Sequence, residues 1–292
     1  MLSPNLFNTV FVFPILNLLA FFYKIFLLVH LPAAFGLAIV ALTLVVRGIL
    51  HPFFHKQMET AKKMQDLKPH LDRLSKKHGK DKKKLQEEQM RLYQQAGINP
   101  ASGCLFMIIQ IPIFIALYNT LSLFLTNGGG TQKVITEINK ALYSPALKFT
   151  TIDPWFFGFN LALSPAKAGN PIYYLIPVVT GLLQYLQNKA TMPPAPVSEP
   201  KEDVSGKKDD KKSSSDDFQK AMNTQMKYIF PFMIGWFSYT LPVGLSLYWN
   251  IFSLFSIMQY RKLKTQNSNL PLQPRPASTR GESEAGKTTL KS

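Results

Sequence analysis

The chain has 292 residues, and 33 Lys+Arg against 17 Asp+Glu give it a formal net charge of +16. The single cysteine, Cys104, excludes an intrachain disulfide framework and a cysteine-built metal centre. Apolar runs of about 20 residues alternate with lysine-rich runs, which is typical of a polytopic membrane protein. A basic chain can also bind nucleic acid. The positive-inside bias of membrane proteins explains the charge more simply, so we expect no specific nucleic-acid readout.

Residues 1–30 are apolar but interrupted by polar or helix-breaking side chains: Pro14, Asn17, Lys24 and His30. Asn17 and Lys24 are seven residues apart and share one helical face, which favours an amphipathic helix lying in the membrane interface. A membrane-spanning signal anchor and a cleaved signal peptide are the alternatives. No basic segment precedes the apolar run and no A-x-A site follows it, which weighs against cleavage.

Residues 31–54 are long enough to cross a hydrocarbon core of ~30 Å at ~1.5 Å per residue, and they include Arg47. Residues 55–103 then carry 12 Lys/Arg and 6 Asp/Glu. Two stretches of this segment have leucines at helical spacing: Leu67, Leu71 and Leu74, then Leu85 and Leu92. The pattern predicts a charged helical hairpin outside the bilayer.

Two further apolar runs, at 104–125 and 171–190, are predicted to be the second and third spans. Between them, residues 126–170 are weakly charged and rich in Gly, Pro and aromatic residues, which indicates an extracytoplasmic loop. Residues 191–227 are rich in Pro, Ser, Lys and Asp. Their stretch before residue 218 buries too little apolar surface to offset its ordering entropy, so we expect a disordered linker.

The last apolar run covers residues 228–259, and one straight helix of that length would be ~48 Å long, too long for the bilayer core. Two short spans, at 228–241 and 244–260, fit better, with a turn at Pro242 and Val243. The polar residues 261–292 that follow are predicted to be a disordered basic tail.

Charge bias predicts the topology. The hairpin, the stretch 188–227 and the tail hold 27 of the 33 basic residues. If all three are cytoplasmic, an even number of spans separates each pair. The expected fold is therefore an all-α integral membrane protein with five transmembrane helices, an N-terminal interfacial helix and a cytoplasmic helical hairpin. Its N-terminus lies outside and its C-terminus inside.

Arg47 is the strongest candidate functional residue, because an arginine at the centre of a membrane helix costs ~2.5–3.5 kcal/mol on insertion scales. The apolar runs contain no Asp or Glu, so its counter-charge must come from water, lipid phosphate or a substrate. The alternative is snorkelling, because Arg47 is only about two turns from the polar His55 and Lys56.

Other polar or amphipathic side chains in the spans include Gln110, Gln184, Gln187 and Trp249. Gathered near Arg47 they would line a wet groove, but each alone can equally bond two neighbouring helices. The sequence has no recognisable catalytic set, and His51 and His55 lack a third metal ligand. We therefore expect no enzyme activity, cofactor or metal.

Several motifs resemble the YidC/Oxa/Albino insertase family. They are AGINP followed by Gly-Cys and QIPIFIALY at the start of the second run, LPVGLSLYWNIFSLFSIMQ near the end, and an arginine in the first span. The resemblance covers roughly residues 1–262. The large periplasmic domain of some members is absent, and the linker is longer than the family's usual short loop.

The resemblance implies five spans around a hydrophilic groove that is closed to the outside. It assigns to Arg47 the attraction of acidic substrate tails, and to Gln187, Trp249, Gln110 and Gln184 the lining of the groove. The implied function is insertion and chaperoning of nascent membrane proteins in the bacterial cytoplasmic (inner) membrane, alone or with the Sec translocon. The ribosome and anionic lipids are further expected partners. A small-anion secondary transporter and a membrane assembly scaffold without insertion activity remain alternatives.

Overall fold

The computed structural model describes residues 2–78, 81–99, 102–125, 132–191 and 225–267. The predicted disorder at 192–224 and 268–292 falls outside these described residues. The described part is mostly helical, as expected. It contains one antiparallel pair of two-residue strands, β1 (Trp155–Phe156) and β2 (Phe159–Asn160).

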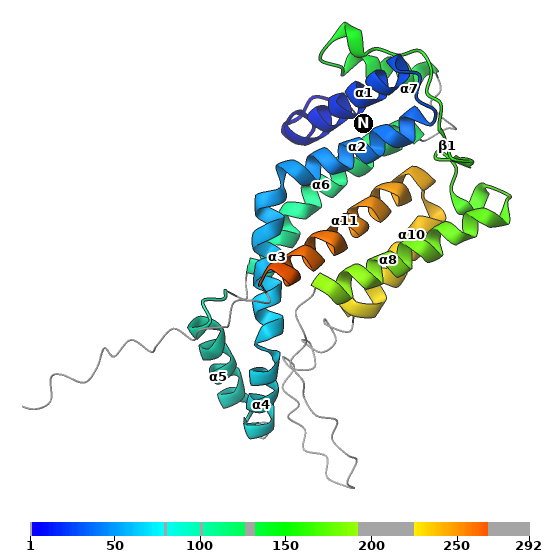
Figure 1. Ribbon diagram of the computed structural model, residues 1–292. Helices are drawn as coiled ribbons and strands as arrows, with labels where there is room; N and C mark the ends of the chain where they lie inside the picture. The colour runs from blue at the N-terminus through cyan, green and yellow to red at the C-terminus, as the bar shows by residue number, and fades with distance from the viewer. Residues whose placement is uncertain (1, 79–80, 100–101, 126–131, 192–224, 268–292) are drawn as a thin grey trace, which may run out of the picture.

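The helices of the N-terminal half are η1 (Asn8–Val12), α1 (Phe13–Leu28), α2 (Ala34–Ile49), α3 (His51–Asp66), α4 (Lys68–His78) and α5 (Lys82–Gln95). Those of the C-terminal half are α6 (Ser102–Leu125), α7 (Gln132–Lys140), η2 (Pro145–Leu147), η3 (Pro165–Lys167), η4 (Pro171–Tyr174), α8 (Leu175–Thr191), η5 (Gln225–Ile229), α10 (Phe230–Thr240) and α11 (Val243–Asn267). Figure 1 shows α1, α2 and α6 beside α11, α10 and α8, while α3 leads away to the pair α4 and α5.

The segment 31–54 differs from the single span that its composition predicts. Helix α2 ends at Ile49, and α3 begins at His51 after a bend of 70°. Leu50 leaves the helical region with φ −86° and ψ 2°, and Pro52 stands in the first turn of α3. Pro52 has no backbone N–H to donate to the carbonyl four residues earlier, at Gly48, so α2 cannot continue through it and the helix breaks where the apolar run continues.

Length and composition make one described helix, Asn8–Leu28, long and apolar enough to cross a membrane. The bent pair α2 and α3 would be a second candidate if it counted as one span, and Ile111–Leu125 is a shorter apolar helix. The choice between interfacial helix and span for residues 1–30 therefore stays a prediction, as does the number of spans.

The segment between α6 and α8 is fastened to α1 by side chains of that helix. The Asn17 amide donates to the carbonyl of Ala141 at 3.1 Å and accepts from the backbone N–H of Tyr143 at 2.6 Å. The Tyr23 hydroxyl accepts from the Asp153 N–H at 3.1 Å. Because these bonds bridge more than 120 positions of the chain, Asn17 and Tyr23 order a segment that has little regular structure of its own.

The same segment also contacts α2 and the start of α11. A Cβ at Gly36 would lie 1.9 Å from the Phe156 ring, so only glycine leaves room for the ring against α2. The backbone N–H groups of Val243 and Gly244 donate to the carbonyls of Leu163 and Leu161, each at 2.9 Å. The segment therefore covers one end of the helical bundle.

Helices α8 and α10 approach each other closely at two glycines. The Cβ position of Gly235 would lie 3.6 Å from Cα of Gly181 and 3.2 Å from the carbonyl oxygen of Pro177. Small residues at such a crossing let the backbones make close van der Waals contact, which is how helices associate without a hydrophobic driving force.

The C-terminal helix is longer than the predicted span 244–260. Helix α11 continues to Asn267, so residues 261–267 are helical and not part of a disordered tail. On its last turns Tyr260 and Leu263 pack with Phe54 and Met58 of α3. Burial against α3 explains why this polar stretch stays helical.

The charged segment 55–103 begins within α3 and continues into two packed helices, α4 and α5, which share a small apolar core with the end of α3. Leu67, Leu71 and Ile98 are buried, with Met64 and Leu92 packed against them. The side chain of Asp81 caps α5 by accepting from the Lys84 N–H at 3.1 Å. Burial raises the pKa of the nearby Tyr93 hydroxyl above its ordinary value.

Candidate functional site

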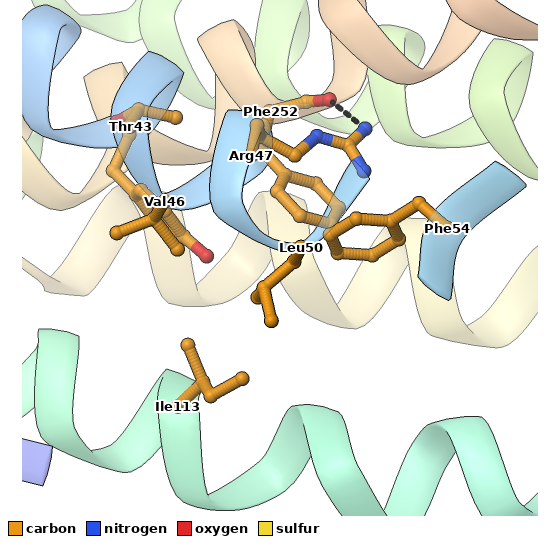
Figure 2. Close-up of a pocket in the computed structure, with 8 residues that line it drawn as sticks. Thr43, Val46, Arg47, Leu50, Phe54, Ile113 and Phe252 are labelled. Atoms are coloured by element: carbon orange, nitrogen blue, oxygen red, sulfur yellow. Dashed lines mark hydrogen bonds between the residues drawn. The ribbon is translucent and has the colours of Figure 1, made fainter. Parts of the chain in front are cut away.

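Arg47 lies in the last turn of α2, three residues before the break at Leu50. The negative end of the helix dipole favours a cation there. Its side chain is only 3% exposed, so it does not reach out to solvent as the snorkelling alternative would require. The break at Leu50 directs α3 so that Phe54 comes to the guanidinium (Figure 2).

The hydrogen bonds of Arg47 go to α11. Nη2 donates to the carbonyl oxygen of Phe252 at 3.2 Å and to the Ser256 hydroxyl. Nε is buried and has no hydrogen-bond partner among the described residues. Arg47 also makes no ion pair within the described residues, whose salt bridges all join residues outside the apolar runs.

Aromatic rings complete the surroundings of the guanidinium. Its Cζ is 4.1 Å from the ring centroid of Phe252 and 4.2 Å from that of Phe54. These two rings meet edge to face, with centroids 6.0 Å apart and planes at 73°, and so form a corner around the charge. Phe255 lies farther away, at 5.4 Å. Each ring face attracts the cation without neutralising it.

A small cavity of about 10 Å³ adjoins the arginine, which is roughly the space that one water molecule needs. Its walls come from α2, α3, α6 and α11, so residues far apart in the sequence meet here. The lining residues are Thr43, Val46, Arg47, Leu50, Phe54, Ile113, Tyr248 and Phe252.

Of the other predicted groove residues, Gln184 joins two helices. Its amide donates to Oδ1 of Asn188 at 3.3 Å, and its carbonyl oxygen accepts from the Ser253 hydroxyl of α11 at 3.4 Å. This is the interhelical bonding that was the alternative for such residues. Gln187, one turn on, has a buried Oε1 without a partner among the described residues.

Trp249 is buried and stacks on Phe114 of α6, with ring centroids 5.7 Å apart and planes at 14°. It follows Tyr248, which lines the cavity, but Trp249 itself does not. Gln110 belongs to α6, and its side chain lies outside what the structure describes. Of the four predicted site residues whose side chains the structure describes, it therefore brings one, Arg47, to the cavity.

A second polar cluster lies elsewhere between α8, α10 and α11. The Ser238 hydroxyl is 2.7 Å from that of Ser246 and donates to the Thr180 hydroxyl at 3.2 Å. All three residues are fully buried. These hydroxyls bond one another, so the cluster joins the three helices.

Sequence reasoning missed the groups that hold Arg47. Phe252 and Ser256 are one helical turn apart on α11. This spacing predicts that they share a helix face, but it does not predict which residue packs against that face. Phe54 is seven residues after Arg47, and in an unbroken helix it would lie on the arginine's own face two turns away. Only the bend at Leu50 brings it to the guanidinium, and hydropathy carries no signal for that bend.

Comparison with known proteins gives a family. A model of the 60Kd inner membrane protein family matches residues 26–269. The chain is similar to the membrane protein insertase YidC of Oceanobacillus iheyensis, with 31% identity over 89% of this chain and 85% of that protein. It is also similar to the inner membrane ALBINO3-like protein 2, chloroplastic, of Chlamydomonas reinhardtii, with 33% identity over 87% of this chain.

Lengths differ among these relatives. The match covers 55% of the Chlamydomonas protein. A membrane protein insertase YidC of Nitratidesulfovibrio vulgaris is 32% identical over 84% of this chain but only 36% of its own length. The chain thus spans about half or less of these two relatives and most of the Oceanobacillus one.

Proposed function

This chain belongs to the 60Kd inner membrane protein family, which includes YidC and ALBINO3 proteins, and from that premise we infer that it is an inner membrane protein that inserts nascent proteins into the membrane. The observation in the structure that supports this best is Arg47, a cation buried among neutral groups with no ion pair within the described residues. A permanently paired arginine would not be available to a substrate.

Arg47 attracts acidic residues in the short tail of a substrate that crosses the membrane. Two opposite charges ~4 Å apart attract by several kcal/mol when water is largely excluded. The substrate's apolar segment then leaves sideways into lipid, and its burial at ~25 cal/mol per Å² drives the process. No bond is made or broken, so the activity is not that of an enzyme. Gln110, Gln184, Gln187 and Trp249 are proposed to border the path of the tail.

The membrane topology that we propose has five spans, with the N-terminus outside and the C-terminus in the cytoplasm. The charge distribution of the sequence supports it, because the hairpin and tail carry most of the basic excess. The hairpin then faces the cytoplasm, and the segment between α6 and α8 covers the outer end of the bundle. In a bacterium the membrane is the cytoplasmic one.

Partners beyond the substrate follow from the charged surfaces. Helices α4 and α5 expose Lys68, Arg73, Lys76 and other basic residues. Such residues gain ~1 kcal/mol each near an anionic membrane surface. Anionic lipids, the ribosome and the Sec translocon are therefore proposed partners, and the protein acts alone or beside the Sec channel.

The test is reconstitution. Purified protein in liposomes receives a single-spanning substrate with a short acidic tail, and protection of the tail from external protease is scored. Protection well above that in empty liposomes is expected. Protection equal to that in empty liposomes contradicts autonomous insertion. Normal substrate binding without protection would then favour a scaffold, and uptake of a labelled small anion would favour a transporter.

A further inference from the structure

The cavity beside Arg47 is too small for the encounter that its proposed role requires. A space of about 10 Å³ holds at most one water molecule, and the arginine is 3% exposed. A carboxylate with its hydration cannot enter. Some group that covers the guanidinium must therefore move before an acidic tail can reach it.

The groups that cover the arginine belong to two different elements. Phe252 and Ser256 lie on α11, and Phe252 contributes both its ring and its backbone carbonyl. Phe54 lies on α3, beyond the 70° bend at Leu50. The α11 groups lie within the bundle, whereas α3 continues away from it toward α4 and α5 (Figure 1). Phe54 is therefore the covering group that a movement of α3 would withdraw.

A second set of contacts holds α3 against the bundle about three turns farther on. The Tyr260 hydroxyl of α11 donates to Oε1 of Gln65 at 2.5 Å. The Gln65 amide donates to the carbonyl of Ala190 in α8 at 3.1 Å. One side chain of α3 thus joins two helices of the bundle, next to the apolar contacts of Met58 and Leu263.

From this geometry we propose that α3 is a cover for the Arg47 site. When α3 is docked, Phe54 closes the corner around the guanidinium and the bond between Gln65 and Tyr260 acts as a latch. When α3 swings out, Arg47 becomes open to substrate carboxylates. The proposal rests on the proposed function of Arg47 and adds that access to the arginine is controlled from α3.

The α4–α5 hairpin is connected directly to α3, so a partner bound to the hairpin can move α3. Helix α4 starts at Lys68, directly after α3 ends at Asp66, and Figure 1 shows both continuing away from the bundle. The 16 residues of α3 make a rod of ~24 Å. A partner that pulls on the hairpin therefore acts on the latch before it acts on Phe54.

Accessibility of the cavity tests the cover without using insertion. Thr43 lines the same cavity and is 1% exposed. The full chain carries Thr43→Cys with Cys104→Ser, so that one thiol remains, and is placed in liposomes. The rate of modification by a small sulfonate-bearing thiol reagent is measured. The expected rate is slow in this parent protein.

Two variants open the cover by different routes. Phe54→Leu keeps an apolar side chain but removes the ring. We expect the rate of thiol modification to rise about tenfold, equivalent to ~1.4 kcal/mol. Tyr260→Phe removes only the hydroxyl that bonds Gln65, and we expect the rate of thiol modification to rise about threefold. Phe53→Leu is the matched control, because that ring packs on Phe54, 6.4 Å away, and not over the arginine.

Equal rates for Phe54→Leu and Phe53→Leu would overturn the proposal. A faster modification rate in Phe54→Leu but not in Tyr260→Phe would indicate only a local void at Phe54. It would contradict the claim that the bond between Gln65 and Tyr260 holds α3 in place. The result is separate from the function of Arg47: faster modification in both variants, with no effect of tail acidity on insertion, supports the cover and contradicts the proposed role of the arginine.

Discussion

Arg47 shows how one charge is kept in an apolar site with no acidic partner among the residues that the structure describes. Placing an arginine in mid-membrane costs ~2.5–3.5 kcal/mol on insertion scales. Cation–π contacts give ~2 kcal/mol when desolvated, and hydrogen bonds to a charged group give ~1.5–3 kcal/mol. The contacts with Phe54, Phe252 and Ser256 are therefore large enough to offset the cost while leaving the charge unneutralised.

Asn17 gives a prediction at a position away from the proposed groove. Asn17→Leu leaves the Ala141 carbonyl and the Tyr143 N–H without their partner. Each unsatisfied buried group costs ~1–3 kcal/mol, so the segment after α7 should open locally. Faster amide hydrogen exchange over residues 141–153 is expected. Phe21→Ala, at an exposed position of the same helix, should leave exchange unchanged, and equal effects of the two would contradict the assignment.

At the residue scale the sequence identifies a candidate functional side chain better than it identifies the residues in contact with it. Arg47 stands out because its apolar run contains no acid that could pair with it, but its burial is seen only in the structure. Gln184 was ambiguous between groove and helix contact, and its bond to Ser253 could not be inferred because it depends on the relative rotation of α8 and α11. Phe54 was missed because its position depends on the bend at Leu50, for which Pro52 is a signal in the sequence.

Helices α8 and α10 depend on their glycine contact for stability. Gly235→Leu places a side chain where the Pro177 carbonyl and Cα of Gly181 already stand, so the helices must separate. A loss of ~1–3 kcal/mol is expected from overpacking, measured as a lower Tm in detergent. Gly48→Ala, where nothing lies within 4 Å of the new Cβ, should be neutral or stabilising. A Tm unchanged by Gly235→Leu would rule out the close crossing.

The α4–α5 hairpin should fold as a small unit around Leu71. Leu71→Ala removes a side chain that is 2% exposed and should cost ~2–5 kcal/mol, enough to unfold so small a core. The measurement is protease cleavage within residues 68–95 of the reconstituted protein. Met90→Ala, at an exposed position on α5, is the control. Equal cleavage of both variants would mean that the hairpin core contributes nothing.

At the scale of elements, periodicity and charge predict the hairpin because leucines repeat at helical spacing in a charged background. Boundaries are predicted less well. Residues 31–54 read as one run because Leu50, Phe53 and Phe54 continue the hydropathy across the break. Residues 261–267 read as tail because their helix is stabilised by packing on α3, which composition does not encode.

The two ends of the helical bundle differ. The segment between α6 and α8 covers one end, and α3 packs against the other. Backbone bonds to Val243 and Gly244 and the Phe156 ring on Gly36 fasten the segment between α6 and α8 over the bundle. At the opposite end the described contacts of α3 with α8 and α11 run through Gln65 and a few apolar residues. The asymmetry fits a protein that admits its substrate from one side.

The central claim is that Arg47 acts on acidic substrate tails, and a double-mutant cycle measures it directly. Insertion by wild type and Arg47→Ala is compared for tails with acids and with the matching amides, with Arg47→Lys in parallel. The account predicts that Arg47→Ala lowers insertion of acidic tails about tenfold more than insertion of the matching amide tails, a coupling of ~1.4 kcal/mol. Arg47→Lys should retain part of this coupling. Additive losses, with Arg47→Ala impairing neutral and acidic tails equally, would contradict a direct role of this charge.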